Sequence, residues 1–257
     1  MDDRGFTRYF ALGDSMSIDL YPALDVGEVD VAVALERIAS VGRVAPLGAA
    51  SLLYQNAEER WPEHIADDLA SLVPGIAYTN LAADGATIGD VFGEQVDAVE
   101  ASDEPALVTL TVGSTDLWTV AGGKPRRALL GQIGRDLTAA YDFVVESLRE
   151  RLPAATIVLT TVCDPSDRSG RIPGVHDGGP LPLDLLDLLN DHVRGFPDRA
   201  RDVIVADAYA HFLGHGVSAA DDAQWYWKRS LVELNARGAN ELRDVWLAAL
   251  RERGSLD

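Results

Sequence analysis

The sequence predicts an α/β protein with one parallel, doubly wound sheet covered by helices on both faces. Short apolar segments rich in β-branched residues recur along the chain, and stretches with helical spacing of apolar residues separate them. This alternation requires a crossover after each strand, and right-handed crossovers place helices on both faces. Several apolar segments end in polar turn residues, which predicts a functional edge at the carboxyl ends of the strands.

Five segments have the composition of buried strands. The first, Tyr9 to Leu12, is continuous and apolar and ends at Gly13-Asp14-Ser15. The other four, in chain order, are residues 76–81, 107–112, 156–162 and 203–206. The sequence therefore predicts a five-stranded sheet.

Amphipathic helices are expected between and after these strands. Residues 58–72 place Ile65, Leu69 and Leu72 on one face and are followed by Pro74-Gly75, so a helix is predicted there. Further helices are expected over residues 137–152, over 183–193 and in the closing segment from 242 to 250. Residues 16–60 receive no secondary-structure assignment. Because they follow the first strand directly, parts of this segment are expected to line a pocket at the carboxyl end of that strand.

Length and composition are those of a single domain spanning residues 1–257. Hydrophobic residues make up 47% of the chain and charged residues 25%, and this length can bury a sizeable core. The formal net charge of −19 repels phosphate backbones and anionic membranes, and no dense Lys/Arg cluster reverses it locally. We therefore expect no nucleic-acid partner.

The sequence predicts a cytoplasmic protein without a cofactor. No apolar run is long enough to cross a bilayer, and no basic-then-apolar leader is present. The single Cys163 cannot form an internal disulfide and is expected to be a small buried hydrophobe. Gly122-Gly123-Lys124-Pro125 lacks the phosphate-loop pattern, and no Gly-x-Gly-x-x-Gly follows a strand, so nucleotide binding has no support.

Ser15 is a candidate nucleophile because of its place in the chain. It follows the first strand, and in open α/β sheets ligands bind at this edge. Gly13-Asp14-Ser15 is also a common turn sequence. By themselves, these three residues favour a plain turn over a catalytic site. Two further segments are expected at the same edge: the turn Gly113-Ser114-Thr115-Asp116 and the loop from Asp207 to Glu233. The loop from 164 to 182, which carries Arg168, Arg171 and His176, is a candidate substrate lid.

With these positions in place, the chain resembles the SGNH (GDSL-type) hydrolases, a family of esterases, lipases and carbohydrate deacetylases with a flavodoxin-like three-layer fold. The resemblance spans almost the whole chain. It rests on four blocks: Gly13-Asp14-Ser15, Asn80 to Thr87, Gly113-Ser114-Thr115-Asp116, and Leu234-Asn235-Ala236-Arg237-Gly238.

The resemblance implies a role for each matched position. Ser15 stands at the family's nucleophile, and the N–H groups of Ser15 and Gly85 stand at its oxyanion hole. Thr115 stands where the family has an Asn that donates to the oxyanion, and it offers at best one shorter hydroxyl donor. The remaining matched positions, which are expected to support the site, are Asp14, Gly113, Asp116 and Asn235.

The family's catalytic base is replaced. Where Asp-x-x-His is expected, the chain has Ser230-Leu231-Val232-Glu233. A serine hydroxyl needs a base, and three candidates remain open: Glu233 at the matched position, His215 between two glycines, and His211. Glu233 would serve as the catalytic base if desolvation raised its pKa toward neutrality. A structural carboxylate is an equally good explanation for this residue. His215 has the better intrinsic pKa, and a loop histidine bonded to backbone is its simpler explanation.

Two functions follow from this. The first is a serine esterase that attacks an acyl or acetyl ester of a small metabolite or sugar. The alternative is a catalytically impaired domain that binds a ligand or protein partner in the inherited cleft, which the loss of the His, its Asp and the Asn favours. The aromatic residues Trp118, Trp225, Tyr226 and Trp227 would stack on a sugar, line an acyl pocket or serve packing alone.

Overall fold

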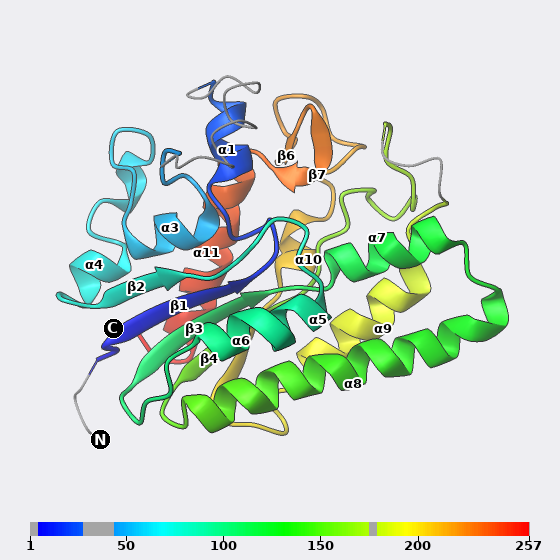
Figure 1. The fold of residues 1–257 in the computed structure, drawn as a ribbon. Coiled ribbons are helices and arrows are strands. Elements are labelled where there is room, and N and C mark those ends of the chain that lie inside the picture. The colour runs from blue at the N-terminus through cyan, green and yellow to red at the C-terminus, as the bar shows by residue number, and fades with distance from the viewer. Residues whose placement is uncertain (1–4, 28–43, 175–178, 257) are drawn as a thin grey trace.

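The computed structural model describes residues 5–27, 44–174 and 179–256. Its main sheet has five parallel strands in the order β2-β1-β3-β4-β5, which confirms the predicted doubly wound α/β/α architecture (Figure 1). The strands are β1 (Arg8–Gly13), β2 (Ala77–Asn80), β3 (Ala106–Thr111), β4 (Thr156–Thr160) and β5 (Val203–Ala206).

The position of β1 in the sheet explains the character of its sequence. It pairs with β2 on one side and β3 on the other, with Tyr9 level with both Tyr78 and Leu107. Because helices cover both faces, β1 and β3 are buried almost throughout, which is why they read as continuous apolar runs. The edge strand β2 is mostly exposed.

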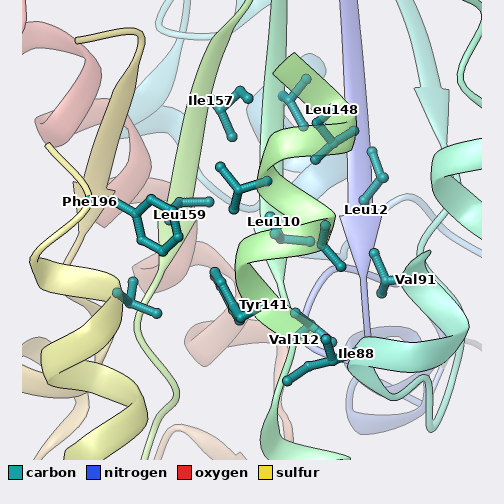
Figure 2. Packing of buried hydrophobic residues seen from close by; sticks show 14 of the residues in the cluster. Leu12, Ile88, Val91, Leu110, Val112, Tyr141, Leu148, Ile157, Leu159 and Phe196 are labelled. Atoms are coloured by element: carbon teal, nitrogen blue, oxygen red, sulfur yellow. The ribbon is translucent and has the colours of Figure 1, made fainter. Parts of the chain in front are cut away.

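One face of the sheet packs against α8 (Arg127–Arg151) and α9 (Leu183–Arg194). Tyr141 and Leu148 of α8 point toward Leu110 of β3 and Leu159 of β4 (Figure 2). These side chains are fully buried, and burying each one stabilises the fold by about 1.5–3 kcal/mol.

The opposite face packs against α11 (Ala236–Glu252) and α3 (Ala49–Tyr54). Trp246 of α11 is fully buried, and its indole Nε1 donates to the Thr160 hydroxyl at 2.9 Å. This contact joins the last helix of the chain to the carboxyl end of β4.

The remaining elements are shorter. They are α1 (Leu20–Asp25), η1 (Pro62–His64), α4 (Leu69–Leu72), α5 (Ile88–Asp90), η2 (Val91–Gln95), α6 (Val96–Ala98), α7 (Ser114–Gly123), α10 (Ala208–Phe212), and the hairpin of β6 (Tyr226–Trp227) and β7 (Ser230–Leu234). Figure 1 shows α1 and the hairpin on the same side of the sheet. Among the described residues no helix combines the length and apolar character needed to span a bilayer.

The predicted helix over residues 58–72 is wrong. Only the single turns η1 and α4 form there, Ala66 between them has a φ of 62°, and Ile65 is 57% exposed. The cause is a tertiary contact of Asp68, which is buried and whose carboxylate accepts hydrogen bonds from the N–H groups of Ser71 and Asn56. Asp68 therefore starts a new helix at Leu69 instead of continuing an earlier one.

Candidate active site

The turn that carries Ser15 is fixed by a close approach between β1 and β3. A Cβ at residue 13 would lie 1.7 Å from the carbonyl oxygen of Thr111, and the φ of Gly13 is 123°, so only glycine fits. The Asp14 N–H donates to the same carbonyl at 2.7 Å. Ser15 is thereby held half-buried at the carboxyl end of β1.

Gln95 clamps the same turn from the side. Its Oε1 accepts from the Gly13 N–H at 2.7 Å, and its Nε2 donates to the Gly13 carbonyl at 2.9 Å. Gln95 is buried although it belongs to a polar segment. Sequence reasoning missed it, and no local signal marks it because the contact spans more than eighty residues.

Asp14 ties the Ser15 turn to the start of α7. Its carboxylate accepts from the Ser114 hydroxyl at 2.7 Å and from the Met16 N–H at 3.1 Å. Asp14 is 1% exposed, and this burial is the main reason that its pKa is raised to about 6. Asp14 therefore links the end of β1 to the start of α7.

Glu233 lies on β7 and meets Ser15. Its carboxyl group lies beside the Ser15 side chain, and its Oε2 is buried with no hydrogen-bond partner among the described residues. Burial raises the pKa of Glu233 to about 7; the Ser15 side chain, as a donor to the charged form, opposes this rise, while the negative charges of Asp84 and Asp14 add to it. The carboxyl group therefore changes its charge near neutral pH, beside a serine hydroxyl.

Tyr21 and Asp84 complete this side of the site. The Tyr21 hydroxyl donates to both carboxylate oxygens of Asp84, at 3.0 and 3.1 Å. Burial and the negative charges of Glu233 and Asp84 raise the pKa of the Tyr21 hydroxyl. Tyr21 belongs to α1, in the segment that the sequence left unassigned, whereas Asp84 lies within the matched block Asn80 to Thr87 but was given no role of its own.

The loop with Gly85 is attached directly to the Ser15 turn. The Ala83 N–H donates to the Gly13 carbonyl at 3.0 Å, and Gly85 follows two residues later with a φ of 69°. A Cβ at residue 85 would meet nothing within 4 Å, so backbone conformation, and not space, is what glycine supplies there.

Thr115 lies in the first turn of α7, and Gly113 precedes that helix with a φ of 119°. The first N–H groups of a helix have no intrahelical acceptor, so this turn presents donors toward the edge where Ser15 lies. Asp116 accepts from the Ile88 N–H at 3.0 Å, which joins α7 to α5. Burial raises the pKa of Asp116.

The structure does not bring the two histidine candidates to Ser15. The His215 Nδ1 contacts the Ala223 carbonyl at 2.9 Å, and because a carbonyl only accepts, Nδ1 carries the proton. The His215 ring stacks on Trp225 with centroids 3.5 Å apart. His211 contacts Glu241 at 3.0 Å. Within the described ranges, no contact joins either histidine to Ser15.

Asn235 sets the position of β7 relative to α11. Its Oδ1 accepts from the Gly238 N–H at 2.7 Å as the cap of α11, and its Nδ2 donates to the Gln224 carbonyl at 2.9 Å. A Cβ at residue 238 would lie 2.1 Å from the Trp225 carbonyl oxygen, so glycine is required there. Glu233, two residues before Asn235, is thereby held in place.

The family model described as GDSL-like lipase/acylhydrolase matches residues 38–240. The chain belongs to this GDSL-like family. A search of curated proteins finds no match.

Several solved structures share the GDSL-type fold of this chain. A phospholipase A1 from Streptomyces albidoflavus NA297 is 19% identical with a TM-score of 0.61, covering 97% of this chain and 100% of the other. Axe2, an acetylxylan esterase from Geobacillus stearothermophilus, is 15% identical with a TM-score of 0.59, covering 99% and 97%. An extracellular lipase from Streptomyces rimosus is 20% identical with a TM-score of 0.56, covering 95% and 99%.

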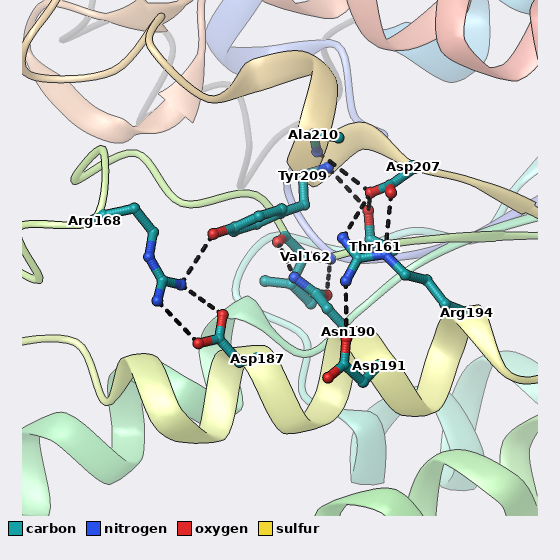
Figure 3. Close-up of polar contacts among 10 residues, drawn as sticks. All are labelled: Thr161, Val162, Arg168, Asp187, Asn190, Asp191, Arg194, Asp207, Tyr209 and Ala210. Atoms are coloured by element: carbon teal, nitrogen blue, oxygen red, sulfur yellow. Dashed lines mark hydrogen bonds and ion pairs between the residues drawn. The ribbon is translucent and has the colours of Figure 1, made fainter.

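In this GDSL-family chain, the candidate lid between residues 164 and 182 is anchored to two helices. Arg168 pairs with Asp187 of α9 and donates to the Tyr209 hydroxyl of α10 at 2.9 Å (Figure 3). Asn190 of α9 bonds both backbone groups of Val162. Residues 175–178, which include His176, lie outside the described residues. The described part of this loop is therefore held against α9 and α10 by specific polar contacts.

Proposed function

We propose that this GDSL-family protein is a serine esterase, or acyl hydrolase, that acts on an acyl or acetyl ester of a small metabolite or sugar. Ser15 is the nucleophile and Glu233 the general base. The observation that carries the proposal is the position of the Ser15 side chain beside the buried Glu233 carboxyl group, whose pKa is raised to about 7.

A base works best when its pKa lies near the operating pH, because it is then both partly ionised and able to hold the proton that it takes. An ordinary glutamate would be ionised but would hold the serine proton poorly. Burial brings the pKa of Glu233 close to neutral pH, so its carboxylate can hold the proton that it takes from Ser15. The family's histidine is thus replaced by a carboxylate with a pKa in the range of histidine.

The proposed reaction has two halves. Glu233 takes the proton from the Ser15 hydroxyl as the oxygen attacks the ester carbonyl, and it returns that proton to the leaving alcohol, which leaves an acyl group on Ser15. Water then donates its proton to Glu233 and attacks the acyl carbon, and the proton returns to Ser15 as the acid departs. No other proton carrier is needed.

The oxyanion formed in each half requires donors. We propose that the N–H groups of Ser15 and Gly85 supply two of them, and that the Thr115 hydroxyl supplies a third in place of the family's Asn. The complete loss of one oxyanion donor typically costs a factor of about 100–1,000 in rate. Because the Thr115 hydroxyl is a shorter donor than the Asn amide, we expect part of this loss and therefore a modest turnover.

Labelling with a fluorophosphonate probe, read by intact mass, tests this proposal. The wild type should gain one phosphonyl group, and Ser15→Ala should gain none while its melting temperature stays close to that of the wild type. Ser51→Ala is a matched control, since it removes a different, buried hydroxyl that contacts Asp19. If the folded wild type remained unlabelled, the esterase proposal would fail and the ligand-binding alternative would replace it.

A further inference from the structure

A small cavity lies beside the Ser15 and Glu233 pair. Its volume is about 30 Å³, and its lining includes Asp14 and Met16, the two neighbours of Ser15 in the chain, together with Val232, the neighbour of Glu233. Ser114, the neighbour of Thr115, also contributes. The cavity therefore lies next to every part of the proposed reaction centre except the Gly85 loop.

Two residues of the cavity lining belong to the protein core. They are Thr160 at the end of β4 and Leu242 of α11, and both are buried. The Thr160 hydroxyl already accepts from Trp246. Lengthening the cavity in this direction would require the sheet and α11 to separate.

Most polar groups in the lining already have protein partners. The Thr111 hydroxyl meets the Ser17 hydroxyl at 2.8 Å, the Thr161 hydroxyl donates to Asp207, and Asp14 accepts from Ser114. The exception is the Tyr226 hydroxyl, which lies beside the Cys163 thiol and has no hydrogen-bond partner among the described residues. The cavity thus offers few unused polar groups, and an apolar occupant suits it better than a polar one.

We propose that this cavity receives the acyl chain of the substrate and restricts the enzyme to esters of two- or three-carbon acids. This inference rests on the proposed esterase function. A water-sized sphere occupies about 10–15 Å³ by this measure, so 30 Å³ admits two or three heavy atoms. An alcohol such as a sugar is too large for it, and the alcohol must also stay within reach of Glu233 for protonation.

Chain-length selectivity of p-nitrophenyl esters tests the proposal. The wild type should hydrolyse the acetate with a kcat/KM at least about a hundredfold higher than that for the hexanoate, because a single methylene that does not fit a rigid pocket can already cost about 10–200-fold. The propionate should remain a good substrate.

Two variants should enlarge the cavity. Val162→Ala removes methyl groups from the cavity wall. Trp118→Ala removes a larger, less buried side chain from the same wall and serves as the second variant if Val162→Ala folds poorly. Each should raise the ratio of butyrate to acetate kcat/KM by about tenfold. Val144→Ala on α8 is the matched control, since Val144 is equally apolar and buried but does not line the cavity, and it should leave the ratio unchanged.

The outcomes separate this inference from the esterase proposal. Ser15-dependent hydrolysis with equal rates for acetate and hexanoate would overturn the acyl-size limit and leave the esterase intact. A cavity that only holds water would leave the ratio unchanged in both enlarged variants, which also overturns the inference. Absence of Ser15-dependent hydrolysis with any ester would overturn both proposals together.

Discussion

The Ser15 side chain lies beside the carboxyl group of Glu233, and the Oε2 atom of that carboxyl group is buried with no hydrogen-bond partner among the described residues. A buried carboxylate in this state is costly unless it is protonated. The nearby charges of Asp84 and Asp14 add to that cost. The site therefore combines a serine with a carboxyl group whose pKa, about 7, is far above that of an ordinary glutamate.

The base assignment predicts opposite effects for two substitutions. Glu233→Gln keeps the shape of the side chain but removes the proton acceptor, so kcat for p-nitrophenyl acetate should fall by about 100-fold or more. His215→Ala should retain most of the activity, because its ring contacts Ala223 and Trp225 and not Ser15. Steady-state kinetics on both variants checks this, and the reverse pattern would make His215 the base.

The pH dependence of kcat/KM should follow the ionisation of Glu233. Because the carboxylate is the active form and its pKa is raised to about 7, activity should rise with pH through that value and be lost below it. Rates measured from pH 5 to 9 test this. An acidic limb near pH 4.5 would mean that Glu233 is not the group whose ionisation limits the reaction.

Stability should respond to pH in the opposite sense. The pKa of Glu233 is higher in the folded state than its ordinary value of 4.5, so the stability that it contributes is present below about pH 4.5 and is lost as pH rises through about 7. Glu233→Gln resembles the protonated form at every pH. At pH 8 this variant should unfold with a free energy roughly 1–3 kcal/mol above that of the wild type, and with a smaller gain at pH 5.

Urea unfolding of both proteins at the two pH values measures this difference. Asp14, whose pKa is raised to about 6, is present in both proteins, so its own pH dependence cancels in the comparison. An equal gain at pH 5 and pH 8 would contradict the raised pKa of Glu233.

Restoring the family's amide should accelerate the reaction. Thr115 lies in the first turn of α7, and an Asn side chain there would carry a donor farther toward the oxyanion. Thr115→Asn should raise kcat by about 10-fold or more. Thr115→Val, which keeps the shape and removes the hydroxyl, is the control, and a slower Asn variant of unchanged stability would give Thr115 another role.

Replacing Asn190 should lower the free energy of unfolding, because its side chain is the hydrogen-bond partner of two buried backbone groups. It is fully buried, its Oδ1 accepts from the Val162 N–H at 2.7 Å, and its Nδ2 donates to the Val162 carbonyl at 2.9 Å. Asn190→Ala leaves both backbone groups unpaired and should cost about 2–4 kcal/mol. Gln132→Ala, at an exposed position of α8, should change stability by less than about 0.5 kcal/mol in the same denaturation experiment.

The five strands of the main sheet are evident in the sequence because their signal is local, whereas the β6–β7 hairpin lies in a segment predicted as a loop. Residues 9–12 and 107–112 are buried on both faces of the sheet, so nearly every position is apolar. The helix over 58–72 could not be predicted correctly by the same method. Its periodicity is real, but a buried carboxylate, Asp68, uses backbone donors from two separate segments and divides it.

The sequence by itself determined that a serine follows the first strand, that Gly85 and Gly113 lie in turns beside it, and that Glu233 replaces the family's histidine. These are properties of residue identity and order, and turn chemistry and strand burial act over a few residues. Only the tertiary structure places Glu233 beside Ser15 and the His215 ring against Trp225. Whether a carboxyl group is desolvated depends on what packs around it, and β7, α1 and the loop with Asp84 come from distant parts of the chain.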